Sequence, residues 1–322
     1  MPDGPVYAGI DIGGTSIKFG LTDSKGKVLH KEQRPTLANK GAEPLLHLVT
    51  NIAESLLLHA AEEEYDVRWV GVGTPGAIDS KTGTVIGSAP NIPGWQGTAI
   101  GEILSERLNM PVHVENDANN VALAESRFGA AVGYSSIVCV TVGTGVGGGI
   151  ILNGRLWRGA NHSAGEIGHM TIKYDGVDCP NGNNGCLERY CSSSAIIERT
   201  RLKLSKQMTP AFESVLDGGL ANLNIKKLFA AAKKNDQVAI EVIEETAGLL
   251  AAGLASVVNF LNPEVVVIGG GVADGGGGFV EAVSAGIKAR AFPSATENLR
   301  IAKATLGNSA GFIGAGLLGE YR

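Results

Sequence analysis

The chain lacks the long apolar run that a membrane span requires. No stretch of eighteen apolar residues occurs, and the N-terminus has neither the basic region nor the apolar core of a secretory signal. We therefore expect a soluble protein of the cytoplasm with no membrane partner. Its 322 residues, 44% of them hydrophobic, are enough for two domains with large buried cores.

Clusters of basic residues are missing as well. The net charge is -5, and Lys and Arg are scattered along the chain. Binding to a nucleic-acid backbone needs a concentrated basic face, so nucleic acid is excluded as the main partner. A small anion held by backbone amides and a metal ion remains compatible with this charge. Cysteine is also scarce: there are four, and Cys139 lies in an apolar strand, which is not the pattern of a disulfide framework.

Glycine, in contrast, is abundant, and much of it forms short tracts between predicted strands. The 46 glycines are about twice the average usage. Two tracts repeat one plan, in which a strand runs into a Gly/Thr bend and a second strand follows. The bends are Gly13, Gly14 and Thr15 in the first copy and Gly143, Thr144 and Gly145 in the second. Their amides can approach a phosphate chain closely, although either bend is also compatible with an ordinary glycine hairpin.

Strands alternate with helices along the chain. Apolar residues at helical spacing predict a helix over residues 43–63, and the strand over residues 69–73 ends in Thr74-Pro75-Gly76. The strand over residues 112–115 ends in Asn116-Asp117, where an Ala-rich helix begins. This alternation indicates an α/β fold, in which ligands bind beyond the carboxyl ends of strands.

Taken together, these residues resemble the ROK family of sugar kinases, within the hexokinase and actin superfamily. The resemblance rests on eight short motifs in a fixed order, at residues 11–18, 73–76, 91–95, 115–119, 143–145, 165–169, 185–188 and 268–272. It implies a two-domain actin/hexokinase-like (ribonuclease H-like) α/β fold with a ligand cleft between the domains. We place the small N-terminal domain at residues 1–118 with a returning C-terminal helix, 307–322, and the large domain at residues 119–306.

The glucokinase branch of the family is the most similar, which implies ATP-dependent phosphorylation of the glucose 6-hydroxyl. Relatives are often homodimers or homotetramers. Fructose, mannose, N-acetylmannosamine and N-acetylglucosamine stay open as substrates, and polyphosphate stays open as the phosphoryl donor.

Two other classes of protein have less support from the sequence. A sugar-responsive repressor needs a winged helix-turn-helix, whereas only ten residues precede Asp11. A nicotinamide-dependent oxidoreductase rests on a G-x-G-x-x-G match at residues 143–148, which precedes a predicted strand where the fingerprint needs a helix.

Two carboxylates are assigned to the chemistry. Asp117 follows a strand and is the candidate general base, although an Asp before an Ala-rich helix also suits an N-cap. Asp11 is the candidate Mg²⁺ ligand, through water, because Mg²⁺ prefers a few carboxylates together with retained waters and phosphates. Lys18 adds charge near the phosphates or is a solvated strand lysine.

The resemblance carries further roles to this chain. The sugar would be bound by Gly76, Asn91, Asn116, Asp117, Glu166, His169 and Glu188. The nucleotide's adenosine would lie against Gly269, Gly270 and Gly271.

A zinc site is where the chain departs from the family pattern. Relatives use one His and three Cys as tetrahedral ligands. Here His169, Cys179 and Cys186 keep their places, but Asn181 stands at the middle cysteine position. Either Cys191 supplies a fourth ligand, or hydrogen bonds hold the loop without a metal.

Overall fold

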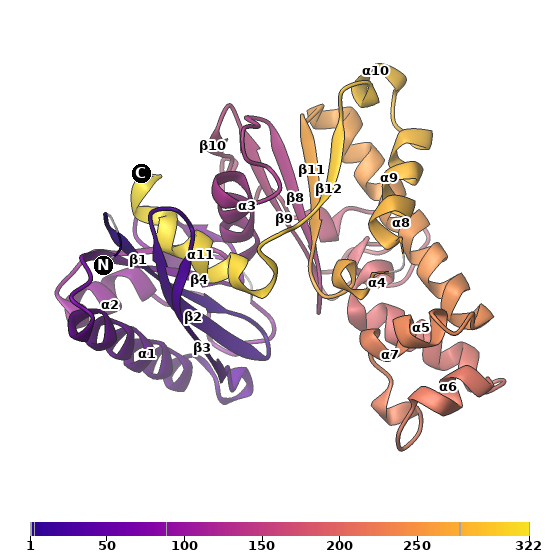
Figure 1. Ribbon diagram of the computed structural model, residues 1–322, viewed down its shortest axis with the longest axis horizontal. Coiled ribbons are helices and arrows are strands. Elements are labelled where there is room, and N and C mark those ends of the chain that lie inside the picture. The colour runs from indigo at the N-terminus through magenta and orange to yellow at the C-terminus, as the bar shows by residue number, and fades with distance from the viewer. Residues whose placement is uncertain (1, 3, 88, 277, 322) are drawn as a thin grey trace. The chain divides into compact units, whose positions relative to one another are not determined.

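The first of two units contains a five-stranded mixed sheet. The computed structural model describes residues 2, 4–87, 89–276 and 278–321. Unit 1 comprises Met1–Ile137, Gly149–Gly165 and Thr305–Arg322, and unit 2 comprises Val138–Gly148 and Glu166–Ala304. The sheet of unit 1 has the order β3-β2-β1-β4-β7 (Figure 1). Its strands are β1 (Val6–Ile12), β2 (Ser16–Asp23), β3 (Val28–Pro35), β4 (Val67–Thr74) and β7 (Val112–Asn116).

The first three strands form an antiparallel meander, and β4 and β7 run parallel to β1. The carboxyl ends of β1, β4 and β7 therefore lie at one edge of the sheet, with Asp11 beside Gly73 and Thr74 beside Asn116. The prediction of a parallel α/β arrangement is confirmed for these strands, and their order brings together the ends that carry the motifs.

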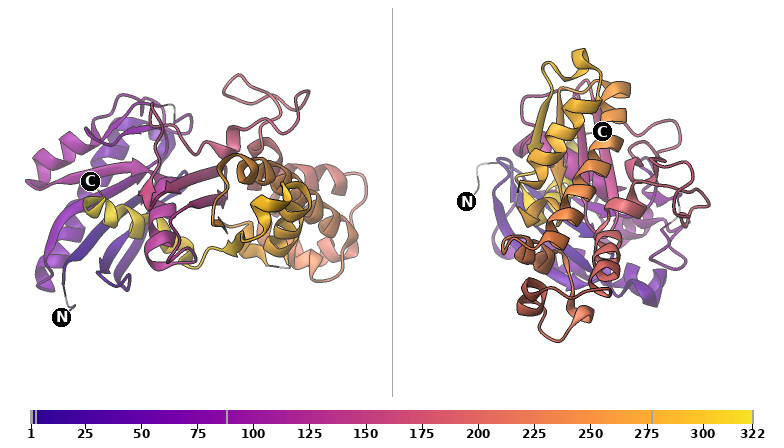
Figure 2. Two further views of the ribbon diagram at one scale, coloured as in Figure 1. Left: turned by 90° about the horizontal axis from the view of Figure 1, so that it is seen from above. Right: turned by 90° about the vertical axis from the view of Figure 1, so that its right-hand side faces the viewer.

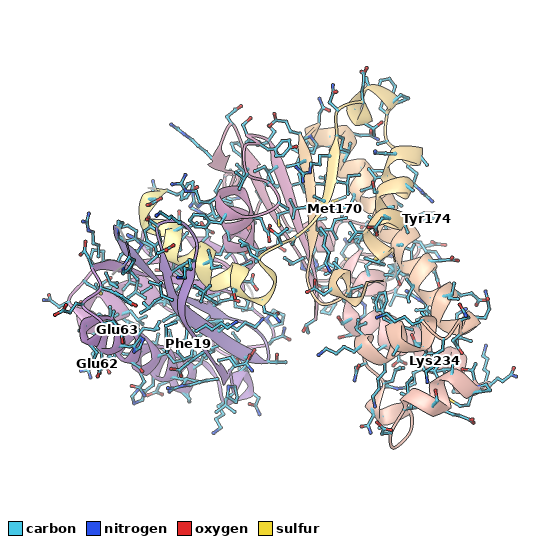
Figure 3. All side chains as sticks on the ribbon, in the orientation of Figure 1. Phe19, Glu62, Glu63, Met170, Tyr174 and Lys234 are labelled. Carbon is cyan, nitrogen blue, oxygen red and sulfur yellow. The ribbon has the colours of Figure 1, made fainter. Side chains whose placement is uncertain are left out.

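Helix α1 (Ala42–Glu62) confirms the predicted helix within one residue at each end. Its buried face consists of Leu45, Val49, Ile52, Ala53, Leu56 and Ala60, at the spacing of an amphipathic helix. Phe19 of β2 is buried in the same core, and Figure 3 shows it pointing into unit 1. The other elements of unit 1 before residue 137 are short: η1 (Ala38–Lys40), β5 (Ile78–Asp79), β6 (Thr84–Val85), α2 (Ile100–Leu108) and α3 (Asp117–Phe128).

The C-terminal segment returns to unit 1, as predicted. It forms η5 (Gly307–Ser309), α11 (Ala310–Gly316) and η6 (Leu317–Glu320), with small residues through most of α11. A Cβ on Gly9 would lie 1.8 Å from the Phe312 carbonyl oxygen, and one on Gly71 would lie 1.7 Å from that of Ala315. Glycine at these two strand positions is what lets the helix backbone lie directly on β1 and β4.

The division between the units differs from the predicted boundary at residue 118. All of α3 belongs to unit 1, together with residues 129–137 and 149–165. Helix α3 packs against α11, and a Cβ on Gly314 would lie 1.8 Å from the Asn120 carbonyl oxygen. This tertiary contact joins α3 to the returning helix, and local sequence signals do not report it.

Unit 2 is built on part of a second sheet, of order β10-β9-β8-β11-β12. Its strands are β8 (Ile137–Val142), β9 (Val146–Leu152), β10 (Arg155–Leu156), β11 (Val265–Gly269) and β12 (Arg300–Lys303). The division of the chain falls within β9, so β10 belongs to unit 1.

Helices form the rest of unit 2. They are η2 (Ile167–His169), α4 (Glu188–Cys191), α5 (Ser193–Leu204), α6 (Pro210–Val215), η3 (Leu220–Asn222), α7 (Ile225–Ala232), α8 (Gln237–Leu261), η4 (Ala273–Gly275), α9 (Phe279–Arg290) and α10 (Pro293–Thr296). Helices α8 and α9 pack side by side (Figure 2). One face of α8 is buried in the core of unit 2, whereas its other face is exposed at Glu241, Glu244, Glu245, Ser256, Asn259 and Phe260. Among the described helices, none combines the length and the apolar character needed to cross a bilayer.

Candidate active site

Two carboxylates influence each other at the strand ends of unit 1. Asp11 is the second-last residue of β1, and Asp117 follows β7. The pKa of Asp11 is raised to about 7, mainly by burial and also by the negative charge of Asp117, while the positive charge of Lys18 lowers it. The Asp11 carboxylate also packs on α11, where a Cβ on Gly311 would lie 2.3 Å from Oδ2. A buried carboxylate that faces a like charge is poorly compensated, and a bound cation would supply the missing charge.

Asn116, and not Asp117, is the N-cap of α3. The Asn116 Oδ1 accepts hydrogen bonds from the backbone amides of Ala118 at 2.9 Å and Asn119 at 3.2 Å. Its Nδ2 donates to the carbonyl oxygen of Gly76 at 3.2 Å, which links the ends of β4 and β7. Asp117 is the first residue of the helix. The N-cap role, which was the alternative to a catalytic role for Asp117, therefore belongs to Asn116.

A buried amide beside Asp11 was missed by sequence reasoning. Both polar side-chain atoms of Asn120 are buried without a hydrogen-bond partner among the described residues. A Cβ on Gly73 would lie 2.6 Å from Asn120 Nδ2 and 3.4 Å from Asp11 Oδ1. The spacing of Asn120 three residues after Asp117, on one helix face, was the available signal. Unsatisfied polar atoms are uncommon in a core and are typical of a site that binds water or a ligand.

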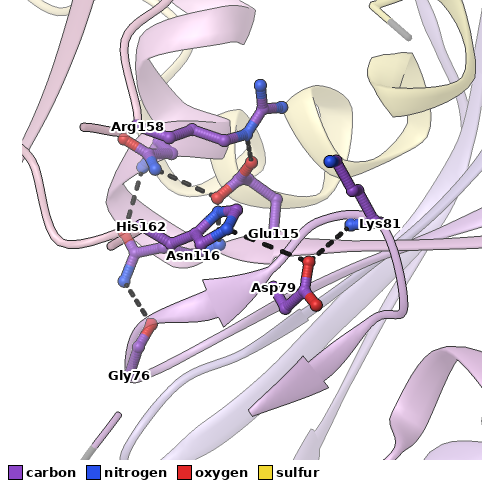
Figure 4. A network of polar contacts seen from close by, with 8 residues as sticks. Gly76, Asp79, Lys81, Glu115, Asn116, Arg158 and His162 are labelled. Carbon is purple, nitrogen blue, oxygen red and sulfur yellow. Dashed lines mark hydrogen bonds and ion pairs between the residues drawn. The ribbon is translucent and has the colours of Figure 1, made fainter. Parts of the chain in front are cut away.

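Glu115 holds the end of β7 through a network that sequence reasoning also missed (Figure 4). One carboxylate oxygen accepts from the Asn116 amide at 2.9 Å and from Asn119 Nδ2 at 3.0 Å, and the other accepts from Arg158 Nε at 2.5 Å. Nearby, His162 Nε2 lies 3.9 Å from Asp79 Oδ1. Glu115 belongs to a recognised motif, but its distant partner Arg158 is set by tertiary structure alone.

The first glycine bend uses one of its predicted phosphate-binding amides internally. The Gly13 amide donates to the Ser16 carbonyl oxygen at 3.1 Å, which closes the hairpin. Within the described chain, no hydrogen bond engages the amides of Gly14 and Thr15, and both residues are exposed. Lys18 donates to Asn308 Oδ1 at 3.1 Å and pairs with Asp11 in the β1–β2 register. It therefore lies beside the carboxylate whose pKa it lowers.

Asn91 lies on an exposed loop that is anchored by its neighbours. Ile92 and Trp95 are buried, and Trp95 Nε1 donates to Thr74 Oγ1 at 2.8 Å. This bond ties the loop to the carboxyl end of β4, two residues before Gly76, whose φ of 99° favours glycine.

The second glycine bend, in unit 2, is also partly closed from within. The Gly143 amide donates to the Gly145 carbonyl oxygen at 2.9 Å. Glu188 Oε2 accepts from the Val146 amide at 2.8 Å, and a Cβ on Gly145 would lie 2.4 Å from that oxygen. No hydrogen bond to the Thr144 amide occurs within the described chain. Glycine at position 145 is needed for the close approach of the Glu188 carboxylate.

Three predicted sugar-binding residues come together in unit 2. His169 Nε2 lies 3.8 Å from Glu166 Oε2. Burial raises the pKa of Glu166, His169 lowers it, and Glu188 raises it. Two carboxylates and an imidazole in one cluster can accept and donate hydrogen bonds to several hydroxyl groups at once.

Gly269 is the last residue of β11, and Gly270 and Gly271 follow it. Gly270 has a φ of 91°, and a Cβ there would lie 2.5 Å from the Val142 carbonyl oxygen, so only glycine fits. A Cβ on Gly271 would meet no atom within 4 Å. The backbone at this strand end is therefore open on one side.

The predicted zinc ligands cluster without Cys191. The donor atoms of His169, Cys179 and Cys186 all lie within 4.8 Å of one another, and His169 Nδ1 is buried without a hydrogen-bond partner among the described residues. Burial raises the pKa of Cys179 to about 11, with Cys186 adding to the shift. Cys191 instead lies in the core of unit 2, with its Sγ 3.8 Å from the Thr246 carbonyl oxygen.

The Asn181 side chain makes a hydrogen bond within its own loop. Its Oδ1 accepts from the Asn183 amide at 3.2 Å, and Asn183 Nδ2 donates to Thr171 Oγ1 at 2.9 Å. The remaining His and two Cys fit a zinc ion with three protein ligands, because one imidazole nitrogen and two thiols lie within 4.8 Å of one another. In the described chain, no further His, Cys, Asp or Glu joins this group.

Carboxylates at parallel strand ends and Gly/Thr bends in two sheets of an α/β protein form a chemistry that suits an anionic ligand held together with a cation. The family model described as "ROK family" matches residues 7–321 of this chain. The chain belongs to this family, which confirms the resemblance drawn from the motifs.

Comparisons with individual proteins are consistent with the family assignment. The chain is 37% identical to a glucokinase of Halalkalibacterium halodurans, over 97% of this chain and 94% of that protein. It is 33% identical to a xylose repressor of Caldicellulosiruptor bescii, over 95% of this chain and 76% of that protein. The crystal structure of a ROK family glucokinase from Streptomyces griseus in complex with glucose and AMPPNP matches with a TM-score of 0.86 and 33% identity, over 97% of this chain and 98% of the other. This match confirms the hexokinase-like fold.

Proposed function

We propose that the chain is an ATP-dependent hexose kinase that phosphorylates glucose at the 6-hydroxyl. Relatives named glucokinase over nearly the full length of the chain support this activity. The structural relative that holds glucose and AMPPNP supports the same pair of substrates. The observation that carries the proposal is the pair of acidic side chains, Asp11 and Asp117, at the strand ends of unit 1.

Asp117 is the general base in this proposal. Its carboxylate accepts the proton of the 6-hydroxyl as that oxygen forms a bond to the γ-phosphorus, and the bond from that phosphorus to the β-γ bridging oxygen breaks to release ADP. The N-cap bonds of Asn116 fix the backbone on which Asp117 lies. Asp117 is thereby presented from the first turn of a helix.

Asp11 holds Mg²⁺ through water in this proposal, and the metal would neutralise the phosphate charges when bound. The raised pKa of Asp11 supports this role, because a buried carboxylate with a carboxylate neighbour gains most from a cation. The exposed amides of Gly14 and Thr15, together with Thr144 and Gly145, would receive phosphate oxygens. Lys18 adds positive charge next to Asp11, and the strand end at Gly269, Gly270 and Gly271 would take the adenosine.

The sugar would be recognised by the polar side chains already described. Glu166, His169 and Glu188 form one cluster in unit 2, and Gly76, Asn91 and Asn116 lie on the loops at the strand ends of unit 1. A hexose epimer would leave some of these groups without a partner, which gives selectivity. His169, Cys179 and Cys186 would hold a zinc ion weakly and so orient the imidazole.

A coupled ADP-release assay tests the proposal directly. The panel contains glucose, fructose, mannose, N-acetylmannosamine and N-acetylglucosamine, each with ATP and with polyphosphate, and the metal content is measured on the same preparation. We expect the highest kcat/KM with glucose and ATP. A higher kcat/KM with another hexose would replace glucose by that sugar, and no sugar-dependent ADP release would refute the kinase assignment. The homodimer or homotetramer implied by the family stays a prediction that light scattering tests.

A further inference from the structure

A polar cavity lies in unit 1, and neither Asp11 nor Asp117 is among the described residues that line it. Its volume is about 430 Å³, which is within the usual range of small-molecule sites. The polar side chains that line it are Ser80, Lys81, His113, Arg158 and Tyr321. No Asp or Glu is among the described residues that line it; besides Val114 and Leu318, the lining consists of a lysine, an arginine, an imidazole and two hydroxyl groups.

Lys81 contributes an uncompensated charge. It lies in the turn between β5 and β6, where Asp79 Oδ1 accepts from the Lys81 backbone amide at 3.0 Å. Thr82 Oγ1 donates to the other oxygen of Asp79 at 3.1 Å. The Asp79 carboxylate therefore orders the turn through its backbone, and the Lys81 ammonium has no ion-pair partner among the described residues (Figure 4).

Arg158 contributes two further donors in a fixed orientation. Its Nε donates to Glu115 Oε2 at 2.5 Å, and Glu115 is itself held by Asn116 and Asn119. In the part of the chain that the structure describes, the two terminal guanidinium nitrogens have no hydrogen-bond partner, and Figure 4 shows them directed away from Glu115. A guanidinium held on one side and open on the other is a preorganised fork for an oxyanion.

His113 and Tyr321 complete the polar wall. The His113 ring packs against Trp69, with 6.3 Å between ring centroids, and comes from β7, an edge strand of the sheet. Tyr321 follows the last helical turn and offers a hydroxyl group. Hydroxyl and imidazole donors next to a lysine and an arginine suit a tetrahedral oxyanion with several acceptor oxygens.

We propose that this cavity binds the phosphate group of a small molecule, either inorganic phosphate or a sugar phosphate. Lys81 provides a point charge and Arg158 the fork, while Ser80 and Tyr321 donate to the remaining oxygens. The absence of acidic lining residues in the described chain excludes a cation, and the volume accommodates a phosphate with an attached sugar. This site does not depend on the proposed kinase reaction, because none of its lining side chains takes part in that reaction.

The test measures the binding of inorganic phosphate by isothermal titration. Glucose and AMPPNP are present at saturation so that the candidate active site is filled, and the titration is repeated without them. Lys81→Gln removes one exposed charge from the cavity. The matched control, Lys31→Gln, removes one exposed charge from β3, which is the opposite edge strand of the same sheet. A second arm replaces phosphate with glucose 6-phosphate.

We expect Lys81→Gln to weaken binding about tenfold, since a charge-assisted contact to the phosphate is lost, and Lys31→Gln to leave it unchanged. Inorganic phosphate and glucose 6-phosphate are compared by affinity, and the one that binds more tightly identifies the source of the phosphate group. Equal affinity in the wild type and Lys81→Gln would overturn the proposal, as would the absence of saturable binding in both arms. Because the readout is binding, a chain that binds phosphate here but phosphorylates no hexose would refute only the proposed function.

Discussion

Two polar regions of unit 1 lie near the same strand ends but differ in how fully their groups are paired. Both oxygens of Glu115 accept hydrogen bonds, and an arginine balances its charge. Asp11 faces another carboxylate, and beside it both polar atoms of the Asn120 side chain lack a partner among the described residues. The fold therefore satisfies one buried carboxylate and leaves the other under-compensated.

The cluster around His169 in unit 2 resembles the Asp11 region in this respect. Its Nδ1 atom is buried without a partner in the described chain, next to two thiols. A fully paired buried group stabilises the native state, whereas an unpaired one costs stability unless a ligand binds. The contrast separates polar groups that serve the fold from those that serve binding.

The largest expected effect comes from Asp117→Asn. Removal of the general base should lower kcat by roughly 10²- to 10⁴-fold, while glucose binding is retained because the other sugar contacts remain. Coupled ADP release measures the first quantity and calorimetry the second. Asp66→Asn, at an exposed position in the same unit, is the control. Near-normal turnover in Asp117→Asn would remove this residue from the chemistry.

Glu115→Gln tests the carboxylate whose two oxygens both accept hydrogen bonds. The side chain of Glu115 is 2% exposed, and loss of its charge leaves Arg158 without a counter-ion, so we expect a loss of about 3 to 5 kcal/mol in unfolding free energy. The matched control is Glu54→Gln, which breaks a 2.7 Å pair with Arg107 at 35% and 65% exposure. That surface pair should contribute less than about 1 kcal/mol. Equal losses in chemical denaturation would contradict the contrast.

Asp11→Asn should raise the unfolding free energy of the metal-free protein, which is the opposite of the effect expected for Glu115→Gln. The pKa of Asp11 in the folded state, about 7, lies above its unfolded value, so the protonated form is favoured by folding. The stability that the Asp11 carboxyl group contributes to the fold is fully present below pH 4 and is lost as the pH rises through 7. The variant should therefore match the wild type at low pH and exceed it above pH 7 by on the order of 4 kcal/mol.

Denaturation with chelator at several pH values measures this difference, with Asp66→Asn as the exposed control. A variant that is less stable than the wild type above pH 7 would show that the Asp11 carboxylate is compensated in the fold. Kinase turnover by Asp11→Asn should fall as well, because its Mg²⁺ ligand is lost.

The smallest expected effect concerns zinc. Asn181→Cys supplies a fourth thiol to the group of His169, Cys179 and Cys186, so zinc should bind roughly 10- to 100-fold more tightly than in the wild type. Competition with a chromophoric chelator measures the affinity. Asn181→Ser removes the amide without adding a thiol and is the control. Equal zinc affinity in all three proteins would show that this position does not face the metal site.

Much of the candidate site could be predicted from sequence because its residues lie in local motifs. The bends at residues 13–15 and 143–145 and the strand end at Asn116 follow from short-range patterns. The internal hydrogen bonds of the Gly13 and Gly143 amides could not be predicted, because a bend's internal hydrogen bonds depend on how its strands pair. Asn120 and Arg158 were missed because their significance arises from partners far along the chain.

The sequence by itself determined the family, the alternation of strands and helices and the chemical types at the strand ends, because these depend on residue identity and short spacing. Only the tertiary structure decided which carboxylate is satisfied and which is not. Burial and charge compensation depend on neighbours that are brought together from distant segments, such as Gly311 against Asp11 and Arg158 against Glu115. The loss of a cysteine at position 181 is visible in the sequence, whereas the separation of Cys191 from the remaining ligands is set by the packing of α4 in the core of unit 2.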